Sequence, residues 1–410
     1  MKKSILAMMA AGMLTACSNG SDTPDGPDTP KLPELEKIEI SSEEALVMEG
    51  EQQLAFELFD KVKASATAEQ NSLISPISVH TVLSMIANGM NGQSRADICG
   101  FLHIQADRLD ELNALNSRLV SYLPRLDKNT TIKSTNSIWA NSEAPVKDKF
   151  TSLIGSVYQG EIFQADFSTA EGREKFRNWV ERQTDGMIAN FKMPEDVKLA
   201  VANCISFEGK WADPFKKEAT SDKNFRNGAG INQYVPTMKG FFRNGCKAEG
   251  FSAVRLPFGN GAYRMTLLLP ENETKPLSET SLGYEQWHNI KMALDANRGP
   301  VNIELPRFKV NTESDLKDIF TAMKDTEAFS TTPDLSEMLA NPDFFLNYFI
   351  HYTAIEINEE SAKASSSSVG GIIASEPNVK EEIQFNRPFF YVIDEASTGA
   401  VIFIGALNKI

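Results

Sequence analysis

The feature that most constrains the fold is the order of two apolar patterns along one unbroken stretch, residues 50–410. Apolar residues recur at helical spacing in residues 54–62, 77–88 and 176–191, which predicts helices there. Strand-like segments come mostly later, at residues 198–207, 253–257, 265–269, 301–308, 389–394 and 401–405. No Pro/Gly-rich linker and no internal repeat divides the stretch. Early helices and late strands favour an α+β fold in one large domain over a regularly alternating parallel fold.

The first sixteen residues have the proportions of a signal peptide. Lys2 and Lys3 precede an apolar run that is too short to span a bilayer. The run ends in Leu14-Thr15-Ala16-Cys17, which resembles the lipobox of bacterial lipoproteins, where the cysteine is acylated and becomes the new N-terminus. A plain secretory signal with a chance cysteine is the alternative. We therefore expect residues 1–16 to be removed and Cys17 to carry a lipid.

The residues after the expected lipid site form a spacer. Residues 17–43 are rich in Pro, Gly and Asp, and such a composition cannot bury a core. We expect a tether at 17–43 and a folded domain at 44–410. The location that follows is the bacterial cell envelope, anchored by lipid in the outer membrane and exposed at the surface. The residues themselves do not distinguish the outer face from the periplasmic face.

Composition and motifs exclude several function classes. The formal net charge of −14 argues against nucleic acid as a partner, because phosphate binding needs clustered Lys and Arg. The four cysteines and four histidines show no zinc-ligand spacing, so we expect no metal and no cofactor. The chain lacks GxSxG, HExxH, GxxxxGK[ST] and GxGxxG. Ser78 lies near His80, but this pair alone is weak support for a hydrolase, and we interpret both residues as structural.

The segment Glu359 to Asn378 reads EESAKASSSSVGGIIASEPN and is dominated by small residues. A flexible Ser/Gly loop is the plain interpretation. In a strand, however, alternate residues would point to opposite sides, so the segment would have two different faces. One face would carry residues that are nearly all small: Ala362, Ala364, Ser366, Ser368, Gly370 and Ile372. The other face would carry the only charge between residues 361 and 375, that of Lys363. This pattern permits insertion of the segment into a packed sheet.

Taken in order, a series of short motifs resembles the serpin family of serine protease inhibitors over nearly the whole domain. The motifs are NSLISPIS (71–78), GMNG (89–92), NSIW (136–139), NWV (178–180), TDGMI (184–188), ANCISFEGKW (202–211), VPTM (235–238), LPF (256–258), LPRF (305–308), FNRPF (385–389) and FIG (403–405). Met187 departs from the pattern, since the family usually has Lys there. Single motifs are weak, but the ordered series is specific.

The resemblance implies a fold and a mechanism. The fold would have mainly antiparallel sheets A, B and C, about nine helices and an exposed reactive-centre loop at about residues 359–384. The protein would be no enzyme but a suicide substrate. A target serine protease, or alternatively a cysteine protease, would attack the loop and form an acyl-enzyme in a covalent 1:1 complex with a monomeric inhibitor. The cleaved loop would then insert as a strand of sheet A and trap the protease.

The hinge and the reactive bond follow from the same resemblance. The hinge would be Glu359, Glu360, Ser361, Ala362, Lys363 and Ala364. It departs from the family pattern at positions 361, 362 and 363, where Gly, Thr and Glu are usual. Counting along the loop places the reactive bond between Ser375 and Glu376, with cleavage near Ile373 or Ala374 as the alternative. The small apolar residues there suit elastase-like or subtilisin-like proteases, and the lack of Lys or Arg argues against trypsin-like targets.

Two supporting clusters also carry over by motif. Ser75, Ser78, Asn203 and His351 match the positions of the shutter, a buried polar network under the place where sheet A opens. Trp211, Arg307 and Glu359 match the breach, where the loop first inserts. A salt bridge between Arg307 and Glu359 would restrain early insertion. The alternative function is a non-inhibitory surface binding protein with the serpin fold.

Overall fold

The computed structural model describes residues 37–186, 192–296, 299–341, 344–360 and 381–410, and these residues form eight α-helices and two β-sheets. The helices are α1 (Ser42–Ser65), α2 (Pro76–Gly89), α3 (Gly92–Phe101), α4 (Leu109–Tyr122), α5 (Asp148–Tyr158), α6 (Ala170–Gln183), α7 (Tyr284–Ala296) and α8 (Leu316–Met323). Short 3-10 turns lie at Ala106–Arg108, Leu123–Arg125, Lys217–Ala219 and Leu277–Glu279.

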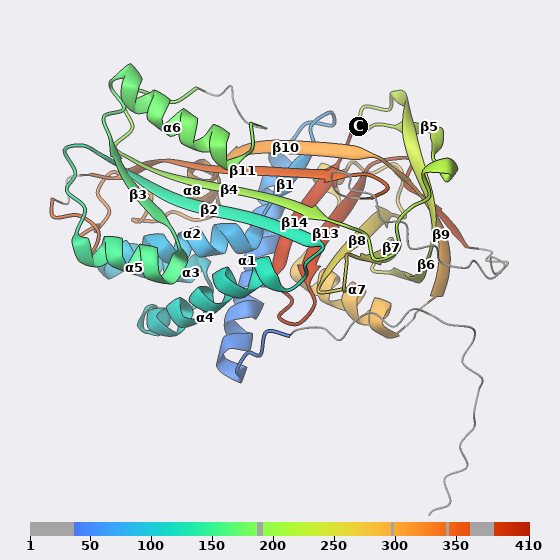
Figure 1. Cartoon of the computed structure of the whole chain (residues 1–410), viewed down its shortest axis with the longest axis horizontal. Coiled ribbons are helices and arrows are strands. Elements are labelled where there is room, and N and C mark those ends of the chain that lie inside the picture. Colours follow the sequence, from blue (N-terminus) through green and yellow to red (C-terminus); the bar gives the residue numbers. More distant parts are fainter. Residues whose placement is uncertain (1–36, 187–191, 297–298, 342–343, 361–380) are drawn as a thin grey trace, which may run out of the picture.

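A five-stranded sheet, which corresponds to the expected sheet A, runs across the molecule (Figure 1). Its strand order is β10 (Phe308–Asp315), β11 (Leu346–Ile357), β4 (Leu199–Gly209), β2 (Thr130–Asn141) and β3 (Glu161–Ala165). β10 pairs with β11 and β4 pairs with β2 in antiparallel fashion, whereas β11 with β4 and β2 with β3 are parallel pairs.

The expected sheets B and C form one continuous nine-stranded sheet. Its order is β1 (Ser72–Ile74), β14 (Val401–Leu407), β13 (Phe389–Glu395), β8 (Tyr263–Pro270), β7 (Phe251–Pro257), β6 (Asn232–Ala248), β9 (Gly299–Pro306) and β12 (Glu382–Gln384), with β5 (Ser221–Arg226) paired to β6. β6 joins the two halves because its first part pairs with β5 and β9 while its last residues pair with β7.

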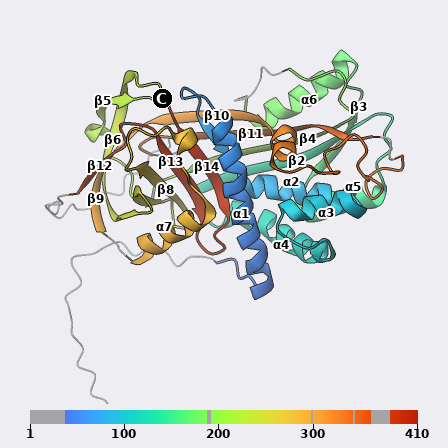
Figure 2. The same ribbon diagram turned by 180° about the vertical axis from the view of Figure 1, so that it is seen from behind.

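The helices cover the five-stranded sheet on both faces. α6 packs on one face, where Trp139, Phe176, Trp179 and Tyr352 belong to one hydrophobic cluster (Figure 1). α1, α2 and their neighbours lie on the other face, seen from behind in Figure 2, and contribute to the larger cluster. Along β4, Ala200, Ala202 and Cys204 therefore face α6, and the residues between them face α2.

Helix ends explain where the observed elements differ from the expected ones. α1 begins at Ser42, inside the expected tether, because Ser41 and Glu44 form a reciprocal capping box. The expected helix 176–191 begins earlier, at Ala170, where the Thr169 hydroxyl accepts a hydrogen bond from the Gly172 N–H. It also ends earlier, at Gln183, because Asp185 and Gly186 have positive φ angles. Residues 187–191 lie outside the described residues.

The expected strand 301–308 proved to be parts of two strands. β9 ends at Pro306 and β10 begins at Phe308. The N–H of Arg307 still donates to the carbonyl oxygen of Pro236 in the nine-stranded sheet at 2.9 Å, whereas the next residue, Phe308, pairs with Ile357 in the five-stranded sheet. The chain therefore passes from one sheet to the other at Arg307, which places this side chain next to the end of β11.

Candidate functional site

The candidate site is centred on the line where β11 and β4 run parallel and side by side (Figure 1), called the seam from here on. The pairing extends from Leu346 opposite Leu199 to Ile355 opposite Phe207. Parallel strands are not joined by a tight turn. The two halves of the sheet can therefore separate along the seam without breaking a hairpin.

A buried polar chain crosses the middle of the seam. His351 on β11 lies opposite Asn203 on β4, which in turn lies opposite Asn136 on β2. The Nδ1 atom of His351 is 2.5 Å from the Asn203 side-chain oxygen, and the Asn203 amide nitrogen lies 2.5 Å from both the Ser78 hydroxyl and the Asn136 oxygen. Three of the four residues that the sequence placed in the shutter, Ser78, Asn203 and His351, thus contribute their side chains to one network.

Ser75 joins the network through its backbone. It is the N-cap of α2, and Pro76 follows at the first helical position, where no N–H is needed. The Ser75 N–H donates to Nε2 of His351 at 2.9 Å. Its hydroxyl has no hydrogen-bond partner within the described part of the chain. Nε2 must accept this bond, so Nδ1 carries the proton and donates to Asn203.

Burial fixes the neutral form of His351. The side chain is fully buried, and removal from water lowers its pKa to about 3. His80, buried in α2, has its pKa lowered to about 4 for the same reason. Neither ring nitrogen of His80 has a hydrogen-bond partner among the described residues, so it supplies no base to Ser78.

Acid should weaken the native state through these two histidines. Their pKa values in the native state lie below the ordinary value of 6.5, so the unfolded chain binds protons first as the pH falls. Native stability is therefore lost from about pH 6.5 downwards, by about 2 kcal/mol per histidine at pH 5. The loss of unfolding free energy between pH 7 and pH 5, measured by denaturant titration, should shrink by this amount in His351→Gln. The exposed His288 on α7 provides the control, and an equal change in H351Q and H288Q would contradict the assignment.

The end of the seam where β11 finishes is held by the side chain of Glu359, which follows this strand. Its carboxylate accepts hydrogen bonds from Arg307 Nε at 3.0 Å and Nη2 at 2.5 Å, and from the Thr220 hydroxyl at 2.5 Å. Glu359 is 2% exposed. Burial alone would raise its pKa, but the bonds from Arg307 and Thr220 hold the pKa below its usual value. The carboxylate is therefore charged and paired at neutral pH.

Two further hydrogen bonds hold the backbone carbonyl groups of Asn358 and Glu359. The indole N–H of Trp211 donates to the Asn358 carbonyl oxygen at 2.9 Å, and the Phe215 N–H donates to that of Glu359 at 3.2 Å. Trp211 is itself fixed by stacking on Phe258, with ring centroids 4.3 Å apart. The structure thus brings the three expected breach residues together. Phe215 and Thr220 complete the cluster and were missed, because nothing in their sequence context distinguishes them.

Several expected site residues lie outside the described residues. They are Cys17, the hinge residues Ser361, Ala362, Lys363 and Ala364, the remaining alternate positions Ser366, Ser368, Gly370 and Ile372, and the bond region Ile373, Ala374, Ser375 and Glu376. Of the hinge, the structure describes Glu359 and Glu360 only. Glu360 forms an exposed ion pair with Lys217 at 2.5 Å.

Comparison with known proteins identifies the family. The model of the family Serpin (serine protease inhibitor) matches residues 49–410. The chain belongs to the serpin family. A serine protease inhibitor of Cyanea capillata is 28% identical to this serpin over 372 residues, which cover 87% of this chain and 96% of the relative.

Solved structures agree on the fold. Tengpin, a thermophilic serpin in the native state, is 24% identical with a TM-score of 0.80, and the match covers 92% of this chain and 96% of tengpin. Human thyroxine-binding globulin in complex with thyroxine is 20% identical, also with a TM-score of 0.80, and covers 89% of this chain and 99% of its own. At these identities the likeness shows the fold alone. The family as a whole is one of serine protease inhibitors.

Other features of the described residues concern possible metal ligands, membrane-spanning helices and free cysteines. The described residues contain no cluster of three or more His, Cys, Asp or Glu suited to a metal ion, and no described helix has the length and apolar character to cross a bilayer. Cys99 and Cys204 are buried, and burial raises the pKa of both thiols.

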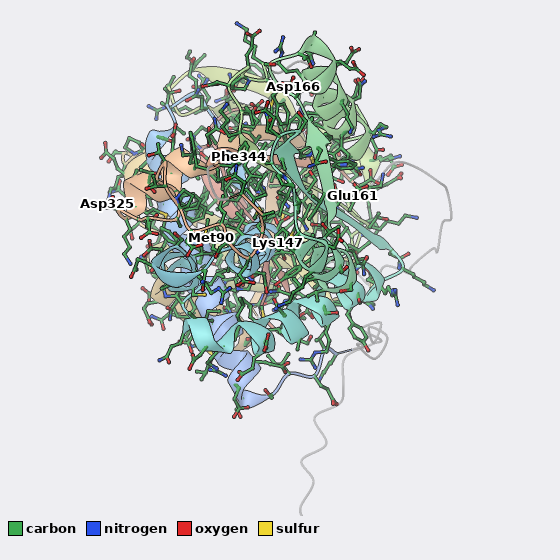
Figure 3. The ribbon with its side chains drawn as sticks, turned by 90° about the vertical axis from the view of Figure 1, so that its left-hand side faces the viewer. Met90, Lys147, Glu161, Asp166, Asp325 and Phe344 are labelled. Carbon is green, nitrogen blue, oxygen red and sulfur yellow. The ribbon has the colours of Figure 1, made fainter. Side chains whose placement is uncertain are left out.

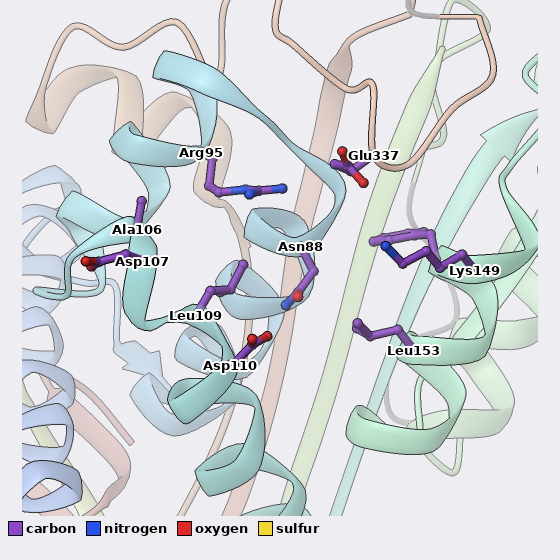
Figure 4. Close-up of a pocket in the computed structure, with 10 residues that line it drawn as sticks. Asn88, Arg95, Ala106, Asp107, Leu109, Asp110, Lys149, Leu153 and Glu337 are labelled. Atoms are coloured by element: carbon purple, nitrogen blue, oxygen red, sulfur yellow. The ribbon is translucent and has the colours of Figure 1, made fainter.

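A hollow of about 300 Å³ lies between α3, α4 and α5 (Figure 4). Its walls include Arg95, Lys149 and Glu337.

Proposed function

We propose that this serpin inhibits serine proteases as a suicide substrate, by inserting its cleaved reactive-centre loop into the seam. The observation that carries the proposal is the direct parallel pairing of β11 with β4, at the point where the chain leaves β11 through Glu359. A strand that continues from β11 after a reversal at residues 359–361 would run antiparallel to both β11 and β4. The loop is therefore connected at the place where a new strand can enter.

The covalent step uses the chemistry of the target protease. Its serine oxygen attacks the carbonyl carbon of Ser375 in the proposed bond, and the Ser375–Glu376 peptide bond breaks. The amine of Glu376 leaves with the proton that the protease supplies, and an ester joins Ser375 to the protease. Insertion carries this ester about 40 Å along the sheet, since about twelve residues advance roughly 3.3 Å each. The protease would then be distorted before water hydrolyses the ester.

Insertion of the cleaved loop would be favourable because it adds hydrogen bonds to the sheet. Inserting one strand between β11 and β4 replaces a single ladder by two. About twelve additional bonds of roughly 0.5–1.5 kcal/mol each give a net gain on the order of 10 kcal/mol. The polar chain from His351 to Ser78 and the bonds of Glu359 oppose the first separation, so they hold the native sheet until cleavage frees the loop.

The proposed targets are elastase-like and subtilisin-like proteases. Mixing the purified serpin with pancreatic elastase or subtilisin should give a complex that survives SDS and boiling, with a mass near the sum of the two chains. Mass spectrometry of the released C-terminal peptide should place its first residue at Glu376, or at Ala374 or Ser375 for the alternative bonds. Complete cleavage of the loop without any SDS-stable complex would contradict inhibition.

That last outcome would favour the second candidate, a non-inhibitory binding protein at the cell surface. The departures at Ser361, Ala362 and Lys363 from the family hinge are the observation in its favour. Ser in place of Gly reduces backbone freedom where the chain must reverse. Alanines at 362 and 364 favour the inhibitory role, because small side chains enter a packed interior without strain.

The proposed location is the bacterial cell envelope, with a lipid on Cys17 and a tether at residues 17–43. The lipobox-like sequence before Cys17 and the Pro/Asp-rich composition after it support this arrangement. A single acyl chain binds membranes only weakly, so stable anchoring requires more than one chain. Partition of the full chain into the detergent phase of a bacterial extract, and its loss in Cys17→Ala, tests the anchor.

A further inference from the structure

The end of the seam where β11 begins contains a β-bulge. Leu346 lies opposite Leu199 and Tyr348 lies opposite Ala200, so Asn347 is an extra residue on β11 without a counterpart on β4. A bulge leaves its extra residue out of the ladder and redirects the side chain. Here the redirected side chain is that of Asn347, at the end of the seam opposite Glu359.

The Asn347 side chain crosses the seam and holds the start of β4. Its Oδ1 atom accepts a hydrogen bond from the Lys198 N–H at 2.8 Å, with the Leu199 N–H at 3.5 Å, and its Nδ2 atom donates to the Asp196 carbonyl oxygen at 3.0 Å. The side-chain amide thus pairs with the backbone of residues 196–199 as a neighbouring strand would. We call these contacts the foot tie.

The loop before β11 is anchored at this end of the molecule by contacts of Met338. The preceding loop packs on α2, since the Met338 N–H donates to the Gly89 carbonyl oxygen at 2.9 Å. A Cβ atom on Gly89 would come within 2.9 Å of the Met338 Cβ atom, so the two backbones approach closely. Lys147, at the turn before α5, also donates its backbone N–H to the Met338 carbonyl oxygen at 2.9 Å. Figure 3 looks onto this end of the molecule, with Lys147 and Phe344 labelled.

The foot tie must break near the end of insertion, because the inserting segment is longer than the paired part of β4. The paired part of β4, residues 199–207, spans about 30 Å at 3.3 Å per residue. An inserting segment of about twelve residues spans roughly 40 Å. Its leading part can enter while Asn347 still holds residues 196–199. Its last residues pass the end of the ladder, where the side chain of Asn347 bridges the two strands.

We propose that Asn347 is a positioning residue that keeps the far end of the seam closed and releases last, so that it controls the completion of loop insertion. The inference rests on the proposed insertion mechanism. Because the foot tie exists only while β11 and β4 are adjacent, it stabilises the native form and contributes nothing to the inserted form. A residue with an ordinary structural role would stabilise both forms.

The test compares native and loop-cleaved protein for Asn347→Ala. We expect a lower thermal unfolding midpoint for native N347A than for the native wild type, and equal midpoints for the two cleaved proteins. We also expect a several-fold shorter half-life of the native monomer at elevated temperature, measured by size exclusion and native gels. Glu356→Ala is the matched control, because Glu356 lies on the same strand but forms an exposed ion pair with Lys309 on β10, away from the seam.

The outcomes separate this inference from the proposed function. If wild-type protein gains no thermal stability on cleavage, the loop does not insert, and both proposals fail. If the wild type gains stability but N347A lowers both midpoints equally, or leaves the native half-life unchanged, insertion stands and the role of Asn347 is overturned. Equal effects of N347A and E356A would also overturn it.

Discussion

Glu359→Lys should convert native monomer into inserted or polymerised forms about tenfold faster than the wild type at elevated temperature. The substitution removes the acceptor of the Arg307 and Thr220 bonds and places an ammonium group beside the guanidinium group. Breaking a buried ion pair by removing one partner costs about 3–5 kcal/mol. The Arg307 side chain is 44% exposed, so water screens part of the repulsion, and we expect about 2–3 kcal/mol. About half of this loss in the barrier to opening corresponds to the tenfold rate.

The measurement is the decay of native monomer, followed by size exclusion and by native gels that separate polymers from the inserted monomer. Glu360→Lys is the matched control, since the neighbouring carboxylate makes only an exposed pair with Lys217. The charge swap Glu359→Lys with Arg307→Glu should restore part of the lifetime. A monomer lifetime of E359K equal to that of E360K would show that the cluster does not restrain the seam.

The shutter and the breach illustrate what a single sequence can predict about this site. His351 and Asn203 are 148 positions apart, and no local pattern connects them. Only the resemblance to serpins placed them together, and the register of β11 against β4 puts them opposite each other. Phe215 contributes a backbone N–H and Asn347 acts through a bulge. The N–H of Phe215 would be present with almost any side chain, and the Asn347 amide reaches β4 only because a bulge redirects it, so the sequence could not indicate either contribution.

The strands of the fold were likewise predictable only where their apolar pattern is clear. β13 and β14 of the nine-stranded sheet, both predicted, are buried on both faces and contain continuous apolar runs. β10 was not separated from β9, because its alternate residues Lys309, Asn311 and Glu313 are polar. β11 carries Asn347 and His351 among its apolar residues, which hides the strand pattern. Of the two strands that form the seam, β4 was predicted as residues 198–207, whereas β11 was not predicted.

Ala364→Arg should turn the protein from an inhibitor into a substrate. Residue 364 belongs to the set of alternate small residues in the loop, which the proposed insertion would bury in the sheet. A guanidinium group there would have to enter a packed interior without a partner, at a cost of several kcal/mol. Insertion would then be slower than hydrolysis of the acyl-enzyme. SDS-stable complex with elastase or subtilisin should fall at least tenfold, while cleavage at the same bond continues.

Lys363→Arg provides the control, since residue 363 lies one position away and would point to the opposite side of an inserted strand. It keeps the charge and changes only the shape, so complex formation should stay close to that of the wild type. The thermal midpoint of the cleaved chain gives an independent measurement: cleavage should raise it for the wild type and K363R but not for A364R. Equal complex yields for A364R and K363R would mean that the alternation of this loop does not decide its insertion, because the two variants differ mainly in which side of the strand carries the arginine.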